Sequence, residues 1–356
     1  MAPLVLGGHA NVVYLQNQWE GTNPNPTAAI LNRYDTTTGH TTVIATVPAI
    51  DEAQVSADGQ WVLFTSAITH RSSAIQLIRM DGQGLQTLYC SSSGEPVFGL
   101  EWSPDQKYLA FKDGFQNVYM LTVATGAYRL EVPPSKSTWY VPRTWLDNTH
   151  LYLTPYSAIG PPPLEVSLLD ISTGKVQRVL TSPASDGDFD SSIDGTQVFS
   201  SEYVFGESVS KGPSSIRVQP AAGGPARVIY STPTDAIRSV RVVSRTNLLF
   251  VIHNAGSVNV DSSHNGLWKI NTDGTGLTRL TTETAEEETT FNHYTQYIWS
   301  TVSPDGKSYA VQLSKNTSSP SRTISLLIGS MNGGSPIAIA TQPYSDQVPL
   351  IGWTSM

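Results

Sequence analysis

The residue types best suited to metal chemistry in this sequence are its histidines. Four of the seven, His70, His253, His264 and His293, lie in segments predicted to be loops. Imidazole nitrogens bind transition metals and exchange protons near neutral pH. No two histidines have the HxH or HxxxH spacing of a local metal motif, so a metal site would require these loops to converge in space. A metal-assisted lyase or hydrolase with these ligands is therefore one alternative function.

A second set of candidate ligands is the run Asp186-Gly-Asp-Phe-Asp190. In a strand, alternate residues face the same side, so Asp186, Asp188 and Asp190 would present their carboxylates together. Carboxylate oxygens are ligands that calcium prefers, but the run lacks the glycine and glutamate that complete an EF-hand loop. The alternatives are a calcium site at these three residues and a solvated acidic linker. No other cofactor is expected.

Motifs for nucleophilic catalysis and for phosphate binding do not occur. The sequence has no G-x-S-x-G elbow and no G-x-x-x-x-G-K-[ST] loop. The single cysteine, Cys90, has no partner for an internal disulfide and is expected to lie in a fourth strand, buried or inert. These observations favour a non-catalytic protein and leave enzymatic activity undecided.

Large aromatic and basic side chains are the remaining candidates for ligand contact. Aromatic rings offer a large contact area at low entropy cost, and tyrosine, tryptophan and arginine are frequent at binding hot spots. The candidates in or beside predicted loops are Trp19, Arg71, Trp139, Tyr140, Arg143, Tyr156, Tyr203 and Phe205. The alternative for each is packing against its own loop. Together with the four loop histidines, they form the predicted binding surface for a protein, peptide or glycan.

The elements that position these residues follow from an internal repeat. The segment 100–111 reads LEWSPDQKYLAF, and the segments 302–311 (VSPDGKSYAV) and 55–64 (VSADGQWVLF) repeat its pattern. Proline fixes φ at a turn position, and Asp-Gly supplies residues that tolerate the positive φ of a tight hairpin. Two antiparallel strands are therefore predicted to meet at each copy.

Two further strands follow each hairpin. A third strand ends in a Gly-containing turn, as in 267–274 (LWKINTDG), and a short fourth strand such as 278–281 (TRLT) follows. Four antiparallel strands per unit make a propeller blade. The hairpin aspartates are Asp58, Asp105, Asp147 and Asp194. They recur at intervals of roughly 40–50 residues, which is the spacing of such blades.

The two ends of the chain determine the number of blades. The N-terminal unit lacks an innermost strand, and the C-terminal segment at about 347–355 has the pattern of such a strand. Pairing the two removes two open sheet edges. The sequence therefore predicts one all-β domain, a seven-bladed β-propeller whose ring is closed by the C-terminal strand. The predicted blades are 10–47 with 347–355, 50–91, 97–133, 140–182, 188–232, 236–282 and 294–342.

Loop lengths predict which face of this propeller binds a ligand. The hairpins described above share one face, and the connections between second and third strands share the other with the links between blades. This second group is long and comprises 16–27, 66–73, 155–163, 201–215, 253–266 and 314–322, with the links between blades at 133–141 and 282–294. Binding residues are often carried by loops on a rigid scaffold.

The segment 283–290 is expected to be a solvated loop, and the tryptophans expected to pack between blades are Trp102, Trp145, Trp299 and Trp353.

The Ser-Pro-Asp-Gly turn, the third strand ending in Asp-Gly and the short Leu-Thr strand together resemble the TolB-like branch of the WD-repeat propellers. The segment 267–282 (LWKINTDGTGLTRLTT) carries the resemblance most clearly, although blades four to six lose Pro, Asp or Gly from the motif. The resemblance covers essentially the whole chain. It implies the propeller fold and a scaffold or partner-binding role, while related propellers gate peptidases or act as polysaccharide lyases. Fold alone does not choose among these roles.

Composition limits the classes of partner and the cellular compartment that are expected. The net charge is −8, and the 21 basic residues are scattered, whereas nucleic-acid binding requires clustered Lys and Arg. No apolar run is long enough to span a membrane. The low charge and the many Ser and Thr residues favour a bacterial, extracytoplasmic protein (periplasmic or at the cell surface), although no signal peptide or anchor is recognised. The leading hypothesis is a monomeric, non-catalytic binding propeller.

Overall fold

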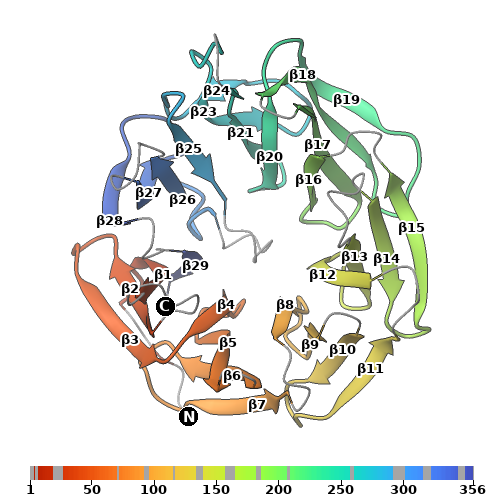
Figure 1. Ribbon diagram of the computed structural model, residues 1–356, viewed down its shortest axis with the longest axis vertical. Helices are drawn as coiled ribbons and strands as arrows, with labels where there is room; N and C mark the ends of the chain where they lie inside the picture. Colours follow the sequence, from red (N-terminus) through yellow and green to blue (C-terminus); the bar gives the residue numbers. More distant parts are fainter. Residues whose placement is uncertain are drawn as a thin grey trace.

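The computed structural model describes residues 4, 7–18, 27–69, 72–91, 96–114, 117–133, 139–156, 165–181, 186–206, 209–256, 260–291, 301–315, 322–343 and 349–355. These residues form strands and turns, with no helix among them and hence none that could cross a membrane. Figure 1 shows seven sheets arranged around a central axis. The predicted all-β, seven-bladed β-propeller is confirmed.

Each blade contains four strands that follow one another from the axis outward (Figure 1). The first three blades are β29 (Leu350–Ser355), β1 (Ala10–Gln18), β2 (Ala28–Asp35), β3 (Thr41–Val47); β4 (Ile50–Val55), β5 (Trp61–Thr69), β6 (Ser72–Arg79), β7 (Gln86–Cys90); and β8 (Val97–Trp102), β9 (Tyr108–Asp113), β10 (Asn117–Thr122), β11 (Tyr128–Val132). Blade four is β12 (Trp139–Trp145), β13 (His150–Tyr156), β14 (Glu165–Asp170), β15 (Lys175–Thr181).

The last three blades are β16 (Asp186–Ser191), β17 (Gln197–Gly206), β18 (Val209–Pro220), β19 (Arg227–Thr232); β20 (Ile237–Val242), β21 (Asn247–Ile252), β23 (Gly266–Asn271), β24 (Thr278–Arg279); and β25 (Glu287–Thr290), β26 (Ser308–Lys315), β27 (Thr323–Ser330), β28 (Ile337–Pro343). The short strand β22 (Ala255–Gly256) leaves blade six and pairs with β18 of blade five.

The C-terminal strand closes the ring, as predicted. Strand β29 pairs antiparallel with β1, from Ala10 opposite Ser355 to Tyr14 opposite Leu350. Trp353 of β29 is 1% exposed and packs in a cluster shared by blades one and seven. The hydroxyl of Thr354 donates to the carbonyl of Gly59 in blade two at 3.0 Å. The two ends of the chain therefore complete one sheet that is bound to both of its neighbours.

The repeated Ser-x-Asp-Gly sequence forms a specific hairpin. In blade two, Asp58 accepts hydrogen bonds from the hydroxyl of Ser56 and the backbone N–H of Gln60, at 2.5 and 3.0 Å. The backbone N–H of Trp61 donates to the same Ser56 hydroxyl oxygen at 2.9 Å. Gly59 adopts φ of +70°, a conformation that glycine reaches without a steric penalty. The motif therefore satisfies the turn from its own side chains, and this is why it marks each blade.

Seven hydrophobic clusters hold the blades together, one between each pair of neighbours. The cluster between blades two and three joins Leu63 and Ile75 to Trp102 and Phe111. Trp145 packs similarly between blades three and four. The prediction that tryptophans pack between blades is confirmed for Trp102, Trp145 and Trp353, and Trp299 lies outside the described residues.

Three expectations are wrong. The segment 201–215, expected to be a loop, is mostly occupied by strands β17 and β18. The segment expected to be a solvated loop contains strand β25, and Glu283 before it is buried. The acidic side chains of this strand are tolerated because Glu287 and Glu288 form ion pairs with Lys315 and Arg238. Cys90 lies in a fourth strand but is exposed. Strand alternation explains this, because the preceding residue of β7 takes the buried position.

The closure predicts a strong stability effect at Trp353. Replacing Trp353→Ala removes a fully buried side chain from the sheet that joins the chain ends, and we expect a loss of about 3–5 kcal/mol in the free energy of unfolding. The control is Ile337→Ala on outermost strand β28, where the side chain is 58% exposed, with an expected change of about 0.5 kcal/mol or less. Denaturant unfolding of both variants measures this, and equal effects would contradict the closure.

Candidate functional site

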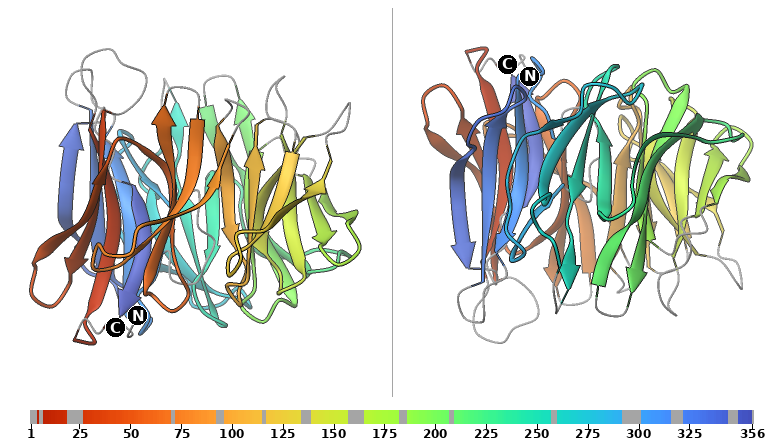
Figure 2. Two further views of the ribbon diagram at one scale, coloured as in Figure 1. Left: turned by 90° about the horizontal axis from the view of Figure 1, so that it is seen from below. Right: turned by 90° about the horizontal axis from the view of Figure 1, so that it is seen from above.

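Two faces of the propeller differ in the connections that they carry. Figure 2 shows the sheets from the side, with connections above and below them. We call hairpin face the side with the connections between first and second strands, such as that from β12 to β13. We call loop face the opposite side, where second strands lead into third strands and each blade leads into the next. The binding residues predicted from the sequence are expected on the loop face.

The structure describes only part of the predicted site. Trp19, His70, Arg71 and His293 lie outside the described residues. Tyr156, Tyr203 and Phe205 lie near the loop-face ends of β13 and β17, and only their backbones are described. Their register places Tyr156 opposite Trp139, and Tyr203 opposite Asp186. The side chains that are described are those of Trp139, Tyr140, Arg143, His253 and His264.

Three of these side chains belong to the innermost strand of blade four. Trp139 and Tyr140 are half-buried where β12 begins at the loop face. Tyr140 also packs against the cluster between blades three and four, so part of its ring is structural. Arg143 lies deeper, where its Nε is buried without a hydrogen-bond partner and its charge acts on Glu52 and Glu101. The structure therefore brings Trp139 and Tyr140 to the loop face, whereas Arg143 serves the interior.

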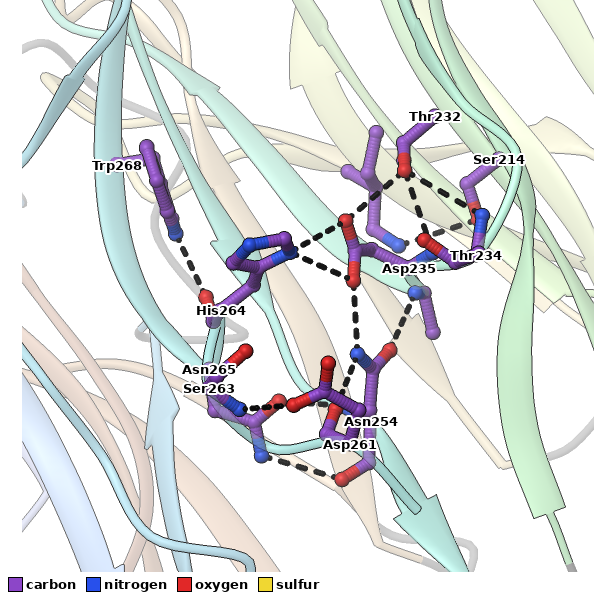
Figure 3. Close-up of polar contacts among 12 residues, drawn as sticks. Ser214, Thr232, Thr234, Asp235, Asn254, Asp261, Ser263, His264, Asn265 and Trp268 are labelled. Atoms are coloured by element: carbon purple, nitrogen blue, oxygen red, sulfur yellow. Dashed lines mark hydrogen bonds and ion pairs between the residues drawn. The ribbon is translucent and has the colours of Figure 1, made fainter.

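A buried carboxylate organises the loop face of blade six. Asp235 lies in the link between β19 and β20 and is 6% exposed. Its two oxygens accept hydrogen bonds from the hydroxyl of Thr232 and the side-chain amide of Asn254, both at 2.9 Å. The Nδ1 atom of His264 lies 3.1 and 3.2 Å from the same two oxygens (Figure 3). Three separate segments of the chain therefore meet at one carboxylate.

Two asparagines fix the connection that carries His264. The backbone N–H of Asn254 donates to the side-chain oxygen of Asn265 at 2.7 Å, and the amide of Asn265 returns a bond to the carbonyl of Asn254 at 3.1 Å. The side-chain amide of Asn254 also reaches the carbonyl of Asp261 at 2.9 Å. Asn254 and Asn265 are 3% and 0% exposed. We call Thr232, Asp235, Asn254, His264 and Asn265 the Asp235 network.

The Asp235 network presents one imidazole to solvent. The side chain of His264 is 54% exposed, and its second ring nitrogen lies on the side away from Asp235 (Figure 3). Because a carboxylate can only accept, Nδ1 carries the proton, and Nε2 is left to accept or donate a bond to a ligand. Within the described part of the chain, no hydroxyl or thiol forms a hydrogen bond with Nε2. The geometry supplies a rigid polar contact.

His253 has a different environment from His264. It is 4% exposed, and its Nδ1 has no hydrogen-bond partner. Arg238 and Glu288, an ion pair of 3.4 Å between blades six and seven, both act on its ring. Burial lowers the pKa of His253, and the carboxylate of Glu288 only partly opposes this. His253 is therefore held neutral inside the protein, and it does not share a surface with His264.

A layer of buried polar side chains surrounds the axis. In blades two to seven, one backbone N–H donates the hydrogen bond that begins the hairpin, and its residue marks an equivalent position in each blade. The residue two places before this donor is polar in all six blades. These residues are Gln54, Glu101, Thr144, Asp190, Arg241 and Thr301, none more than 6% exposed. We call them the central polar ring. Such groups are stable in the interior only when they are hydrogen-bonded.

The central polar ring and its neighbours connect successive blades. The side chain of Gln54 accepts a hydrogen bond from the backbone N–H of Trp102 at 3.3 Å and donates to the carbonyl of Leu100. The carboxylate of Asp190 accepts from the backbone N–H of Val242 at 2.8 Å. In both pairs a side chain of one innermost strand reaches the backbone of the next. The same positions thus serve the same purpose in different blades.

Glu52 makes the connection between blades two and three stronger. Its two oxygens accept the backbone N–H groups of Gly99 and Leu100 at 3.0 and 2.9 Å. In the opposite direction, the indole N–H of Trp145 in blade four donates to the carbonyl of Glu101 at 3.0 Å. Blades two, three and four are therefore joined around the axis by polar contacts as well as by apolar packing.

The predicted calcium ligands have contacts of their own. Asp188 forms an ion pair with Arg241, and Asp190 accepts from Val242 and from the backbone N–H of Ser191 at 2.9 Å. The side chain of Asp186 is not described. Among the described residues, no group of three or more His, Cys, Asp or Glu side chains is arranged to hold a metal ion. Calcium at these three residues stays a prediction.

Solved structures share this arrangement. TolB from Acinetobacter baumannii superposes with a TM-score of 0.52 at 16% identity, covering 96% of this chain and 82% of that chain. Oligopeptidase B from Leishmania major gives 0.55 at 13%, covering 96% of this chain and 50% of that one. A puromycin hydrolase gives 0.56 at 13%, covering 81% and 46%. No family model and no curated protein sequence matches the chain.

The chain has the seven-bladed β-propeller fold that TolB from Acinetobacter baumannii shares. At these identities the likeness concerns the fold, and the function of this propeller has to be argued from its own residues. The match covers about half of the length of the oligopeptidase B and puromycin hydrolase chains.

Sequence reasoning missed the residues that organise both parts of the site. Asp235, Asn254 and Asn265 have no motif, because they meet only after three segments fold together. A signal existed for the central polar ring. The strand IDEAQV (β4) contains Glu52 and Gln54 in a segment that must be buried beside the axis, and a polar residue at a core position requires a specific partner.

The buried carboxyls predict that stability falls as pH rises from about 5 to 8. Burial raises the pKa of Glu52 and of Asp190 to about 7, and it raises that of Glu101 as well. Between about pH 4 and 7 the unfolded chain releases these protons first, so the folded state loses stability with rising pH, by roughly 1 kcal/mol per pH unit for each carboxyl. The exposed aspartates with lowered pKa, such as Asp170 at about 2, titrate below this window.

Denaturant unfolding at several pH values between 5 and 8 measures the effect. We expect Asp190→Asn to be less stable overall but to have a flatter pH dependence, since it has no proton to lose. His253, whose pKa is lowered, contributes a rise of stability with pH in both proteins. Comparing the slope of the variant with that of the wild type therefore removes the contribution of His253. Glu286→Gln, on an exposed side chain, should leave the slope unchanged. An unchanged slope in Asp190→Asn would contradict the assignment.

Proposed function

We propose that this TolB-like propeller is a monomeric, non-catalytic binding module that holds a protein, peptide or glycan against its loop face. The observation that carries the proposal is the Asp235 network, in which a buried, fully bonded frame presents the half-exposed imidazole of His264. Binding sites are stronger when their contacts are held in place before the ligand arrives, because less conformational entropy is lost.

The chemistry of the loop face supports such a partner. His264 can donate or accept a hydrogen bond, and Trp139 and Tyr140 offer half-buried rings at the same face. Aromatic rings with polar neighbours suit sugar rings and peptide side chains alike. The shared fold with TolB agrees with a scaffold role for the propeller.

An extracytoplasmic compartment is part of the proposal. The support comes from composition, because only 14% of the residues are charged and the single cysteine forms no disulfide. Bacterial location outside the cytoplasm would also give the loop face access to cell-envelope proteins and glycans.

A pair of histidine variants tests the role of the loop face. His150 forms a similar contact with a carboxylate, its Nδ1 lying 2.9 Å from Asp147, but it lies on the hairpin face. The full-length chain is applied to a peptide array and a glycan array, and each bound probe is measured again with His264→Ala and His150→Ala. We expect at least a tenfold loss of affinity for His264→Ala and no more than a twofold change for His150→Ala, because only His264 faces the partner.

The contradicting results are equally specific. Equal affinity of all three proteins for the bound probe would place binding away from His264. Cleavage of an offered oligosaccharide together with a stoichiometric transition metal in the purified protein would instead support the metal-assisted lyase or hydrolase.

A further inference from the structure

A cavity of about 400 Å³ lies between blades six and seven. Its walls come from the link after β24, from strands β25, β26 and β27, and from the turn between β27 and β28. Thr282 and the turn residues Gly334 and Ser335 are exposed, so the cavity is open to solvent. This volume is in the range of pockets that hold small molecules.

One wall of the cavity is apolar. Leu280 and Leu327 are 5% and 8% exposed, and both belong to the hydrophobic cluster that joins blades six and seven. Leu313 packs against the same cluster from β26. The cavity is therefore a gap at the end of an otherwise packed interface, and its apolar surface would gain from contact with an alkyl chain.

The lining of the cavity also contains a buried carboxylate. Glu283 is 5% exposed and lines the cavity. One oxygen accepts from the hydroxyls of Thr281 and Thr289, and among the described residues the other accepts the backbone N–H of Thr289 alone, at 3.0 Å. An ionised carboxylate oxygen can accept more than one hydrogen bond. The second oxygen thus has unused hydrogen-bonding capacity.

Glu283 also differs from the other buried acids in its charge environment. Asp190 has Arg241 nearby and Glu52 has Arg143 nearby, and each arginine counters the cost of burial. In the part of the chain that the structure describes, no Lys, Arg or His side chain forms an ion pair with Glu283. The acidic neighbour Glu287 adds to the negative potential. An uncompensated carboxylate at a cavity attracts a cation.

We propose that this cavity binds the alkyl-ammonium group of a ligand, with the ammonium on Glu283 and the alkyl chain against Leu280, Leu313 and Leu327. The same chemistry occurs in a free primary amine and in a lysine side chain. The cavity shares no lining residue with the Asp235 network, although the two are neighbours: the backbone N–H of Glu283 donates to the carbonyl of Asn265 at 3.1 Å. Either proposal can fail without the other.

Pentylamine and 1-pentanol are the matched probes. They have nearly the same shape, and only the amine is charged near neutral pH. Isothermal titration calorimetry with the full chain is expected to show amine binding on the order of millimolar, as is usual for ligands of this size, and at least tenfold weaker binding of the alcohol. Equal binding of the two probes, or no amine binding, would overturn the proposal.

Two variants locate the binding. Glu283→Gln removes the charge and is expected to abolish the preference for the amine. Leu313→Trp fills the cavity without changing Glu283. It therefore provides an independent test if Glu283→Gln does not fold. We expect it to weaken amine binding at least tenfold. Glu286→Gln removes a nearby exposed charge outside the cavity and should change binding less than threefold. Amine binding that persists in Leu313→Trp would place the amine elsewhere and overturn the proposal.

A competition experiment distinguishes the two sources of the ammonium group. A blocked tripeptide, acetyl-Gly-Lys-Gly-amide, is titrated against bound pentylamine, with acetyl-Gly-norleucine-Gly-amide as the uncharged control. Displacement by the lysine peptide alone identifies a lysine side chain of a partner as a fitting ligand. Absence of displacement by either peptide, with amine binding intact, identifies a small free amine.

Discussion

The innermost strands of this propeller are joined by side chains that bond the backbone of the next blade. The carboxylate of Glu52 accepts hydrogen bonds from two backbone N–H groups of β8, and that of Asp190 accepts one from β20. These strands lie beside the axis, where no further strand among the described residues pairs with them on the inner side. A buried N–H without an acceptor would cost about 1–3 kcal/mol. The side chains of one blade therefore complete the hydrogen bonding of its neighbour.

This constraint links the interior to the loop face. Apolar clusters join neighbouring blades, but apolar packing is non-directional. The polar bonds at the axis add direction, because each of them requires one register between two blades. The link that follows β19 then enters β20 at a fixed place, and Asp235 lies in that link. The position of His264 at the loop face depends, through Asp235, on how blades five and six meet.

Much of the fold could be predicted because its signals are local. The Ser-x-Asp-Gly hairpin is satisfied by its own side chains, so each copy marks a blade without reference to the rest of the chain. Closure of the ring by the strand around Trp353 could be predicted because the N-terminal blade lacked one strand and the C-terminal strand lacked a sheet. The acidic strand β25 was not predicted, because its charges are tolerated only through partners far away in sequence, such as the ion pair of Glu288 with Arg238.

The candidate site was less predictable for the same physical reason. Loop histidines and aromatics can be recognised by type, but whether they face a ligand depends on long-range contacts. His253 and His264 lie in the same connection, and yet one is buried and the other exposed, because Asp235 binds only the second. Asn254 and Asn265 carry no signal of their own until the segment between them folds back.

Amide hydrogen exchange at the axis tests the central claim most directly. If the carboxylate of Asp190 holds β20, the N–H of Val242 should exchange only with global unfolding in the wild-type protein. In Asp190→Ala it should become the amide with the largest added loss of protection, while the N–H of Leu100, held by Glu52 in another blade, should follow global stability alone. Equal loss of protection at both amides, or fast exchange of Val242 in the wild type, would contradict the account.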